Sequence, residues 1–309
     1  MPRRAHDAAD GCTRTSRRCA DENGPLDSLL DHYAGILYFG LLAGGFAVLV
    51  VLESFAPRRP LDLGLGSRWI TNVGLLVIDT LLLRSLQPVA AVGIAYYAVD
   101  RDWGLVDLNS VHPVAGIVLA ILLLDLGRYW EHVALHRFKP LWRIHKVHHT
   151  DLDFDCTTGL RFHPLEAVIG VGLDAAVIVA FGVPPMAVVL LSLVYVTETL
   201  FNHANLRLPT GLERALRWVI VTPDMHRVHH SADRRETDTN YAVLFSWWDR
   251  MFGTYRAQPA AGHAGMTMGL HEYRDPLRLS VHRLLLMPFQ RGRPTPVIGD
   301  QRPDNPPLS

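Results

Sequence analysis

Histidines are concentrated in one part of this chain and repeat there at helical spacing. Ten of the 16 histidines fall within the 99 residues from His132 to His230. Offsets of three and four residues place side chains on one face of a helix, and eight of the ten follow this rule. They form HxxxH at His132 and His136, HxxHH at His145, His148 and His149, and HxxHH at His226, His229 and His230.

This pattern predicts a site for transition metals. Neutral imidazole is the commonest metal-binding side chain, and a site of imidazoles with little thiolate suits Fe, Zn, Cu or Ni better than Mg or Ca. The eight histidines, with His163 and His203 as single additions, exceed the three or four protein ligands of one zinc ion. Two metals with several ligands each are the simplest interpretation. The three cysteines form no CxxC pair and do not support thiol chemistry.

The elements that must position these histidines are apolar and long. Hydrophobic residues make up 49% of the chain, and they gather at 33–55, 69–97, 114–130 and 167–201 in runs long enough to suggest membrane helices. The run at 69–97 contains Arg84 and Pro88 and is either one kinked helix or a shorter helix followed by an interfacial piece. A Gly-Val-Pro-Pro break at 182–185 predicts a helical hairpin, either spanning or re-entrant, with His163 and His203 on one membrane face.

We therefore expect an all-α, integral-membrane helical bundle of about four transmembrane helices or hairpin arms, with a cytoplasmic, histidine-rich di-metal cap. Basic residues follow the first helix and surround the histidines, which favours a cytoplasmic, multi-pass arrangement by the positive-inside rule. The arginines at 3–18 would then lie on the opposite face, so either the number of early crossings differs or the tail is an exception to the rule. The expected regions are a disordered tail at 1–32, a transmembrane region at 33–112, a catalytic domain at 113–256, and an interfacial segment with a disordered tail at 257–309. Equal numbers of acidic and basic residues, 30 each, argue against nucleic acid as a partner.

The order of these motifs resembles the fatty acid hydroxylase and sterol desaturase superfamily over residues 114–256. The segments DLGRYWEHVALHR, FNHANLRLP and NYAVLFSWWDRMFGTY carry the resemblance. It implies a membrane protein whose histidines bind two iron ions on the cytoplasmic side and activate O2 for attack on a C–H bond. It places metal ligands at His132, His136, His145, His148, His149, His163, His203, His226, His229 and His230.

The resemblance also raises two questions about the site. Some members carry a second histidine one helical turn after the single one, where this chain has Arg207. His163, Asn205 through a water molecule, or an open position could then complete one metal. Asp125 recurs in the family motif and is predicted to orient a ligating imidazole through a hydrogen bond.

The predicted function is O2-dependent hydroxylation or desaturation of a lipid, fatty acyl, sterol or carotenoid-like substrate that enters from the bilayer. No catalytic residue beyond the metal ligands is identified. A separate ferredoxin or cytochrome would supply electrons, because the chain has no GxGxxG or CxxC motif and no haem domain. The alternatives are a membrane metal-dependent hydrolase, a metal transporter and a b-type haem carrier. A zinc protease would need an HExxH motif and a transporter would need ligands in the middle of its membrane helices, and this chain has neither. A b-type haem carrier needs only paired axial histidines, which would leave most of the histidines unexplained.

Overall fold

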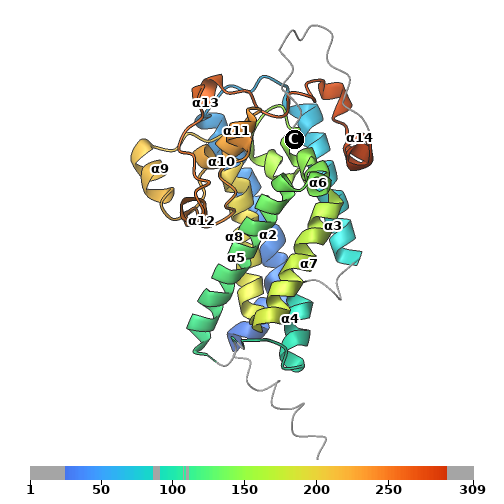
Figure 1. The fold of residues 1–309 in the computed structure, drawn as a ribbon, viewed down its shortest axis with the longest axis vertical. Helices are drawn as coiled ribbons and strands as arrows, with labels where there is room; N and C mark the ends of the chain where they lie inside the picture. The colour runs from blue at the N-terminus through green and yellow to red at the C-terminus, as the bar shows by residue number, and fades with distance from the viewer. Residues whose placement is uncertain (1–24, 86–90, 107, 109–110, 291–309) are drawn as a thin grey trace, which may run out of the picture.

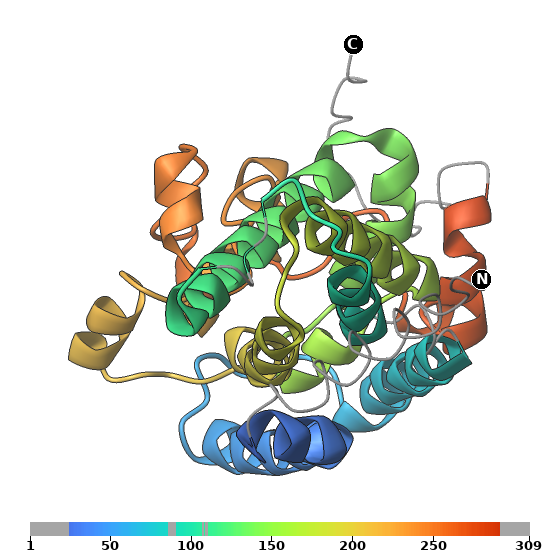
Figure 2. The ribbon, with the colours of Figure 1, turned by 90° about the horizontal axis from the view of Figure 1, so that it is seen from below.

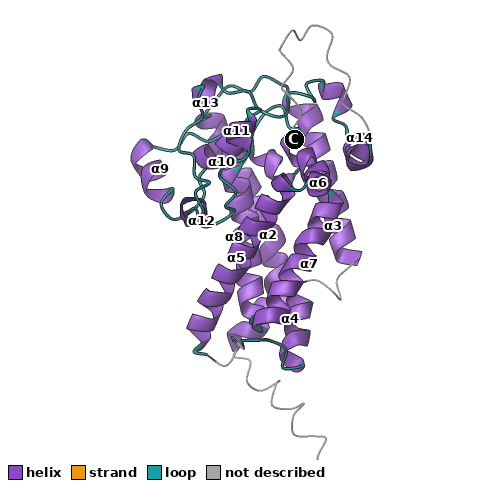
Figure 3. Cartoon of the chain, in the orientation of Figure 1, coloured by secondary structure: helices purple, strands orange, loops and turns teal. Residues whose placement is uncertain are grey.

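The chain folds into helices throughout the part that the structure describes. The computed structural model describes residues 25–85, 91–106, 108 and 111–290. Within these ranges the regular elements are helices, and the β-pairing is limited to three isolated bridges (Figure 3). Several helices begin at a proline, whose fixed φ and missing N–H suit the first helical position. The predicted all-α fold is confirmed.

A bundle of long helices forms one half of the molecule (Figure 1). Its members are α2 (Pro25–Phe55), α3 (Leu65–Ser85), α4 (Ala91–Asp100), α5 (Pro113–Arg137), α7 (Pro164–Phe181) and α8 (Pro185–Asn202). Within the described ranges, four segments are long and apolar enough to cross a membrane: Tyr33–Phe55, Pro113–Arg137, Pro164–Phe181 and Pro185–Asn202. Their number agrees with the predicted four, and the chain is an integral membrane protein.

The predicted hairpin is formed by α7 and α8. Gly182 ends α7 in the left-handed conformation, at φ 54°, which a residue without Cβ adopts at little cost. α7 packs mainly against α4 and α5, whereas α8 packs mainly against α2, and the two arms make little contact with each other. Figure 2 shows the bundle nearly end-on, with α2 and α3 along one side and α5 on the other.

The second apolar stretch contains two helices rather than one. α3 and α4 lie on either side of residues 86–90, which are outside the described residues. α4 packs against α7 and α8 at the end of the bundle far from the cap, with Ala95 and Ala98 fully buried (Figure 1). α4 therefore contributes to the bundle core; a single kinked helix is not observed, and an interfacial position for the second piece remains a prediction.

Short helices and loops form a cap on the opposite end of the bundle (Figure 1). They are α6 (Lys139–His149), η2 (Cys156–Leu160), α9 (Thr210–Leu216), α10 (Pro223–His229), α11 (Arg234–Thr237), α12 (Trp247–Met251), α13 (Gly262–Gly265), η3 (Pro276–Arg278), α14 (Val281–Leu286) and η4 (Met287–Phe289). α2 begins at Pro25, inside the tail predicted at 1–32; residues 1–24 and 291–309 lie outside the described ranges. The division into four regions remains a prediction.

Candidate metal centre

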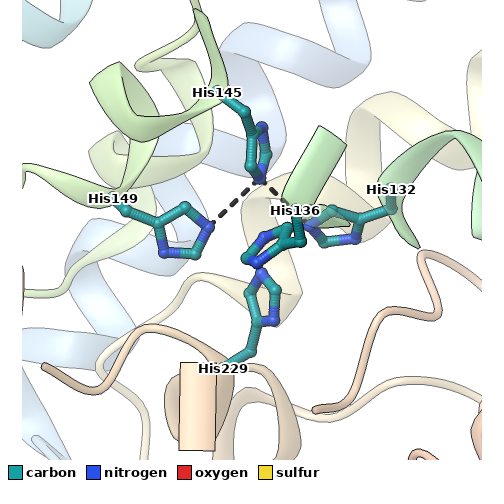
Figure 4. Close-up of side chains that lie close together, drawn as sticks. All are labelled: His132, His136, His145, His149 and His229. Carbon is teal, nitrogen blue, oxygen red and sulfur yellow. Dashed lines mark hydrogen bonds between the residues drawn. The ribbon is translucent and has the colours of Figure 1, made fainter. Parts of the chain in front are cut away.

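Five buried histidines converge at the base of the cap, and we call them the five-histidine group. One nitrogen of each lies within 4.8 Å of the nitrogens of the others. The members are His132 and His136 of α5, His145 and His149 of α6, and His229 of α10. Figure 4 shows the five rings directed toward a common centre from three separate helices. Such a cluster of nitrogens could hold a metal ion.

A second cluster, the four-histidine group, lies beside the first. It consists of His148 from α6, His203 at the end of α8, His226 from α10, and His230 directly after α10. All four are buried, and one nitrogen of each lies within 4.8 Å of the others. The structure thus brings nine of the ten predicted ligands into two neighbouring groups.

Distances between ring nitrogens within the groups match those expected around a metal. The Nε2 atom of His145 lies 3.2 Å from Nε2 of His132 and 3.1 Å from Nε2 of His149. In the other group, Nε2 of His203 lies 3.1 Å from Nε2 of His148. Two nitrogens at about 2.1 Å from one ion, with an angle of about 90° between them, are about 3.0 Å apart. The spacing therefore fits nitrogens that share one ion.

The opposite ring nitrogen of most of these histidines contacts an acceptor outside the groups. These Nδ1 contacts are His132 to the Tyr241 carbonyl (2.7 Å), His136 to Asp238 (3.2 Å), His145 to Glu166 (2.8 Å), His148 to the Arg161 carbonyl (3.2 Å), His203 to the Thr199 carbonyl (2.7 Å) and His229 to the Thr239 carbonyl (2.8 Å). When Nδ1–H donates, the lone pair is on Nε2, which faces the group. Six acceptors therefore select the tautomer that a metal requires.

Unpaired nitrogens point to the same function. Among the described residues, Nε2 of His136 and Nε2 of His229 are buried and have no hydrogen-bond partner. Buried polar atoms nearly always have a hydrogen-bond partner or a ligand, so a ligand is expected at these two nitrogens. A transition metal bound to imidazole nitrogen would satisfy both.

Burial keeps the imidazoles in their neutral, metal-binding form. It lowers the pKa of His145 to about 3 and that of His203 to about 4. Burial also lowers the pKa of His148 and His230 below the ordinary range, and the neighbouring histidines add to this effect. Metal binding requires deprotonated ligands, so no free energy is needed to remove protons from these rings near neutral pH.

His163 is the predicted ligand that the structure does not bring to either group. As the residue that caps α7, it accepts a hydrogen bond at Nδ1 from the Leu165 amide (3.1 Å), and its Nε2 lies 3.1 Å from the Leu285 carbonyl. Asn205 is also engaged elsewhere, because its side-chain amide pairs with both backbone groups of Arg59 at 2.8 and 3.1 Å. Neither residue completes the four-histidine group.

The predicted orienting role of Asp125 is wrong. Its carboxylate accepts hydrogen bonds from the Tyr195 hydroxyl (2.8 Å), the Phe245 amide (3.1 Å) and the Trp248 indole (2.8 Å). These contacts tie the cap segment around Phe245 to α5 and α8 instead of orienting an imidazole. Asp125 is therefore a structural anchor.

Among the described residues, Glu166 and Asp238 are the carboxylates that contact histidines of the two groups, and the sequence analysis identified neither. Glu166 follows His163 in the RFHPLE motif and lies in the first turn of an apolar hairpin. An acidic residue at the start of a membrane helix is a signal for function that could have identified it. Asp238 had no comparable signal, because it stands in a polar segment among other charged residues.

A cavity of about 550 Å³ connects the bundle with both histidine groups. Its wall is formed mainly by apolar side chains of the long helices, including Leu76, Leu83, Leu124 and Leu191. At the cap end it is lined by His132 and His145 of the five-histidine group and by His148, His203 and His226 of the four-histidine group. The volume lies within the range of ligand pockets, and the lining suits an alkyl chain.

Comparisons with known proteins agree with this arrangement. The fatty acid hydroxylase family model matches residues 117–254. Alkylglycerol monooxygenase of Xenopus tropicalis is 27% identical over 226 residues, which are 70% of this chain and 48% of that protein. Ornithine lipid hydroxylase of Rhizobium tropici is 29% identical over 46% of this chain and 42% of its own. A very-long-chain aldehyde decarbonylase of Oryza sativa is 26% identical over 74% of this chain and 89% of its own.

These similarities leave much of the relatives uncovered. The chain spans about half or less of the alkylglycerol monooxygenase and ornithine lipid hydroxylase that it matches. No solved structure matches the chain.

Proposed function

We propose, on the premise that residues 117–254 are a fatty acid hydroxylase domain, that this protein is a membrane di-iron oxidoreductase. It would use O2 to hydroxylate a C–H bond of a lipid-like substrate. The observation that carries the proposal is the pair of buried histidine groups at the end of a mainly apolar cavity. An alkyl chain in that cavity would lie against both groups without leaving apolar surroundings.

The histidines fit two iron ions in number and in chemistry. Five nitrogens would hold one ion and four the other, and imidazole is a suitable ligand for iron. When bound, the iron pair supplies the activation of O2, which no side chain can perform. The chain's own groups orient the imidazoles: Glu166 and Asp238 through carboxylates, and four loop or helix carbonyls through backbone oxygens.

The cavity supports a lipid as substrate and positions it for reaction. Apolar walls exclude water and align an alkyl chain, so that the carbon nearest the histidines is the one exposed to oxidation. The printed names of the relatives describe action on alkylglycerols, ornithine lipids and aldehydes with very long chains. Hydroxylation is our preferred outcome, and desaturation would need only removal of a second hydrogen.

Electron supply and orientation complete the proposal. A separate ferredoxin or cytochrome-type protein would deliver electrons to the cap, and the cap would face the cytoplasm. The support for this orientation is the basic character of the cap-side segments, including Arg58, Arg137 and Lys139.

Metal content tests the proposal directly. Purified wild-type protein in mild detergent should contain about two irons per chain by mass spectrometry. His229→Ala and His148→Ala should each lose about one, because each removes a ligand from a different group. The exposed His282→Ala is the matched control and should retain both. Zinc in place of iron, or iron content that does not depend on these histidines, would contradict the mechanism.

Product analysis tests the reaction. Lipids of a host expressing wild-type protein should contain hydroxylated species that are absent with the His229→Ala and His148→Ala variants. An alkene product would change the assignment to desaturation, and unchanged lipids despite bound iron and an added reductase system would count against a lipid substrate.

A further inference from the structure

The mainly apolar cavity contains an unbalanced set of charges. Its lining includes Asp79 of α3, Arg128 and Glu131 of α5, and Glu166 and Asp174 of α7. The Arg128 guanidinium donates to Glu131 at 2.8 Å and to Asp174 at 2.5 Å. Arg128 therefore forms ion pairs with two of the four carboxylates. The other two have no cationic side chain as a partner among the described residues.

Asp79 and Glu166 each present an unpaired acceptor. Oδ1 of Asp79 and Oε2 of Glu166 are buried without a hydrogen-bond donor in the described part of the chain. The residues are only 8% and 9% exposed, and both line the same cavity. Unpaired buried acceptors are unfavourable, and such groups in native proteins usually have a ligand or a functional reason.

We infer that the cavity binds a lipid whose polar group donates hydrogen bonds to Asp79 and Glu166, with a primary ammonium preferred over a hydroxyl. Four carboxylates against one guanidinium favour a positive charge in the ligand. The apolar wall would receive the alkyl chain. The inference rests on the proposed function, because it takes the cavity as the substrate site, and it specifies an amphiphile rather than a plain hydrocarbon.

The polar group would be held close to the proposed metals. The second carboxylate oxygen of Glu166 lies 2.8 Å from Nδ1 of His145, whose Nε2 faces the five-histidine group. The ligand's donor is therefore separated from this group by about one carboxylate and one imidazole ring. Oxidation is accordingly expected on a carbon near the polar group and not at the far end of the chain.

Direct binding measurements test this inference. Radiolabelled tetradecylamine, tetradecanol and tetradecyl methyl ether have equal chains and differ in donor ability and charge. Purified protein in detergent, both iron-loaded and chelator-treated, should bind the amine about tenfold or more tightly than the ether, with the alcohol between them. Equal affinities for the three would overturn the inference.

Two substitutions at Asp79 separate charge from hydrogen bonding. Asp79→Asn keeps an acceptor, so the amine should lose about tenfold in affinity while the alcohol is little changed. Asp79→Leu removes the acceptor as well as the charge, so the amine and the alcohol should both bind no more tightly than the ether. The matched control is Asp100→Asn on α4, whose side chain is 74% exposed and should have no effect. Unchanged amine binding in both Asp79 variants would contradict the assignment.

The design distinguishes failure of this inference from failure of the proposed function. Asp79 makes no contact with a histidine among the described residues, so both variants should keep wild-type iron content. A preference for donors that persists in wild-type protein lacking iron would support the cavity ligand even if the di-iron proposal fails. If a variant does not fold, the ranking of the three ligands on wild-type protein still decides the question.

Discussion

Each HxxHH motif supplies imidazoles to both histidine groups, because its three side chains point in two directions around the helix. His145 and His149, four residues apart, join the five-histidine group, while His148 joins the four-histidine group. The second motif reverses this assignment: His226 and His230 go to the four-histidine group and His229 to the other. Consecutive helical residues are rotated by about 100°, so neighbours such as His148 and His149 cannot face one centre. One motif can therefore serve two adjacent metals.

A prediction at this scale concerns His263, a buried histidine outside both groups. Its Nε2 lies 3.4 Å from Asp224, yet burial lowers the pKa of His263 to about 4. The ordinary pKa is about 6.5, so the unfolded state binds more protons between pH 4 and 6.5. The contribution of neutral His263 to the free energy of unfolding is complete above pH 6.5 and is lost as the pH falls. At pH 5 the loss amounts to about 2 kcal/mol.

His263→Gln should therefore reduce the loss of unfolding free energy between pH 7 and pH 5 by about 2 kcal/mol. Denaturant titrations of chelator-treated protein in detergent would measure it, with the exposed His282→Gln as control. The same pH dependence in wild type and His263→Gln would show that His263 is not held neutral by the fold.

At the scale of elements, α5 links the bundle to the cap. It contributes His132 and His136 to the five-histidine group, while Asp125 on the same helix accepts the Trp248 indole of the cap. One helical turn along from Asp125, Arg128 pairs with Asp174 of α7. The helix therefore contacts the cap and the hairpin and contributes to the five-histidine group.

A second prediction tests the contact between α5 and α7. A Cβ at Gly170 of α7 would lie 2.2 Å from a terminal nitrogen of Arg128, whereas a Cβ at Gly172 would meet nothing within 4 Å. Because Arg128 is held by Glu131 and Asp174, it cannot move without losing those ion pairs. Gly170→Ala should thus lower the unfolding free energy by about 1–3 kcal/mol.

Gly172→Ala is the matched control on the same helix and should be neutral or stabilising by up to about 1 kcal/mol. Thermal unfolding of the two variants in one detergent would measure the difference. Equal midpoints would mean that Arg128 does not occupy the space beside Gly170.

For the whole molecule, the two histidine groups lie where the bundle meets the cap. The cavity between the long helices ends at the histidines, so an apolar substrate could approach from the bilayer. α4 and the turn of the hairpin are at the far end from the cap (Figure 1). With four candidate membrane-spanning segments in the bundle, these two ends are expected on opposite faces of the membrane.

A third prediction tests this sidedness and the proposed cytoplasmic cap. Asp100→Cys on α4 and Asp233→Cys in the cap would be made in a Cys12→Ser and Cys19→Ser background, in which buried Cys156 remains. A membrane-impermeant maleimide should label Asp100→Cys in intact cells and Asp233→Cys only after lysis. The reverse result would place the cap outside, and labelling of both in intact cells would contradict a spanning bundle.

The amino-acid sequence alone was enough to predict histidine as the candidate metal ligand, the helical spacing of the histidines, the apolar spans and the hairpin. These features depend on local periodicity and run length, which can be read along a chain. The division of nine histidines into two groups became visible only in the folded chain, as did the position of His163 as a helix cap outside both groups. It also showed that Glu166, and not Asp125, contacts a histidine. Such roles depend on which distant elements pack together, and this packing cannot be derived from the spacing of residues along the chain.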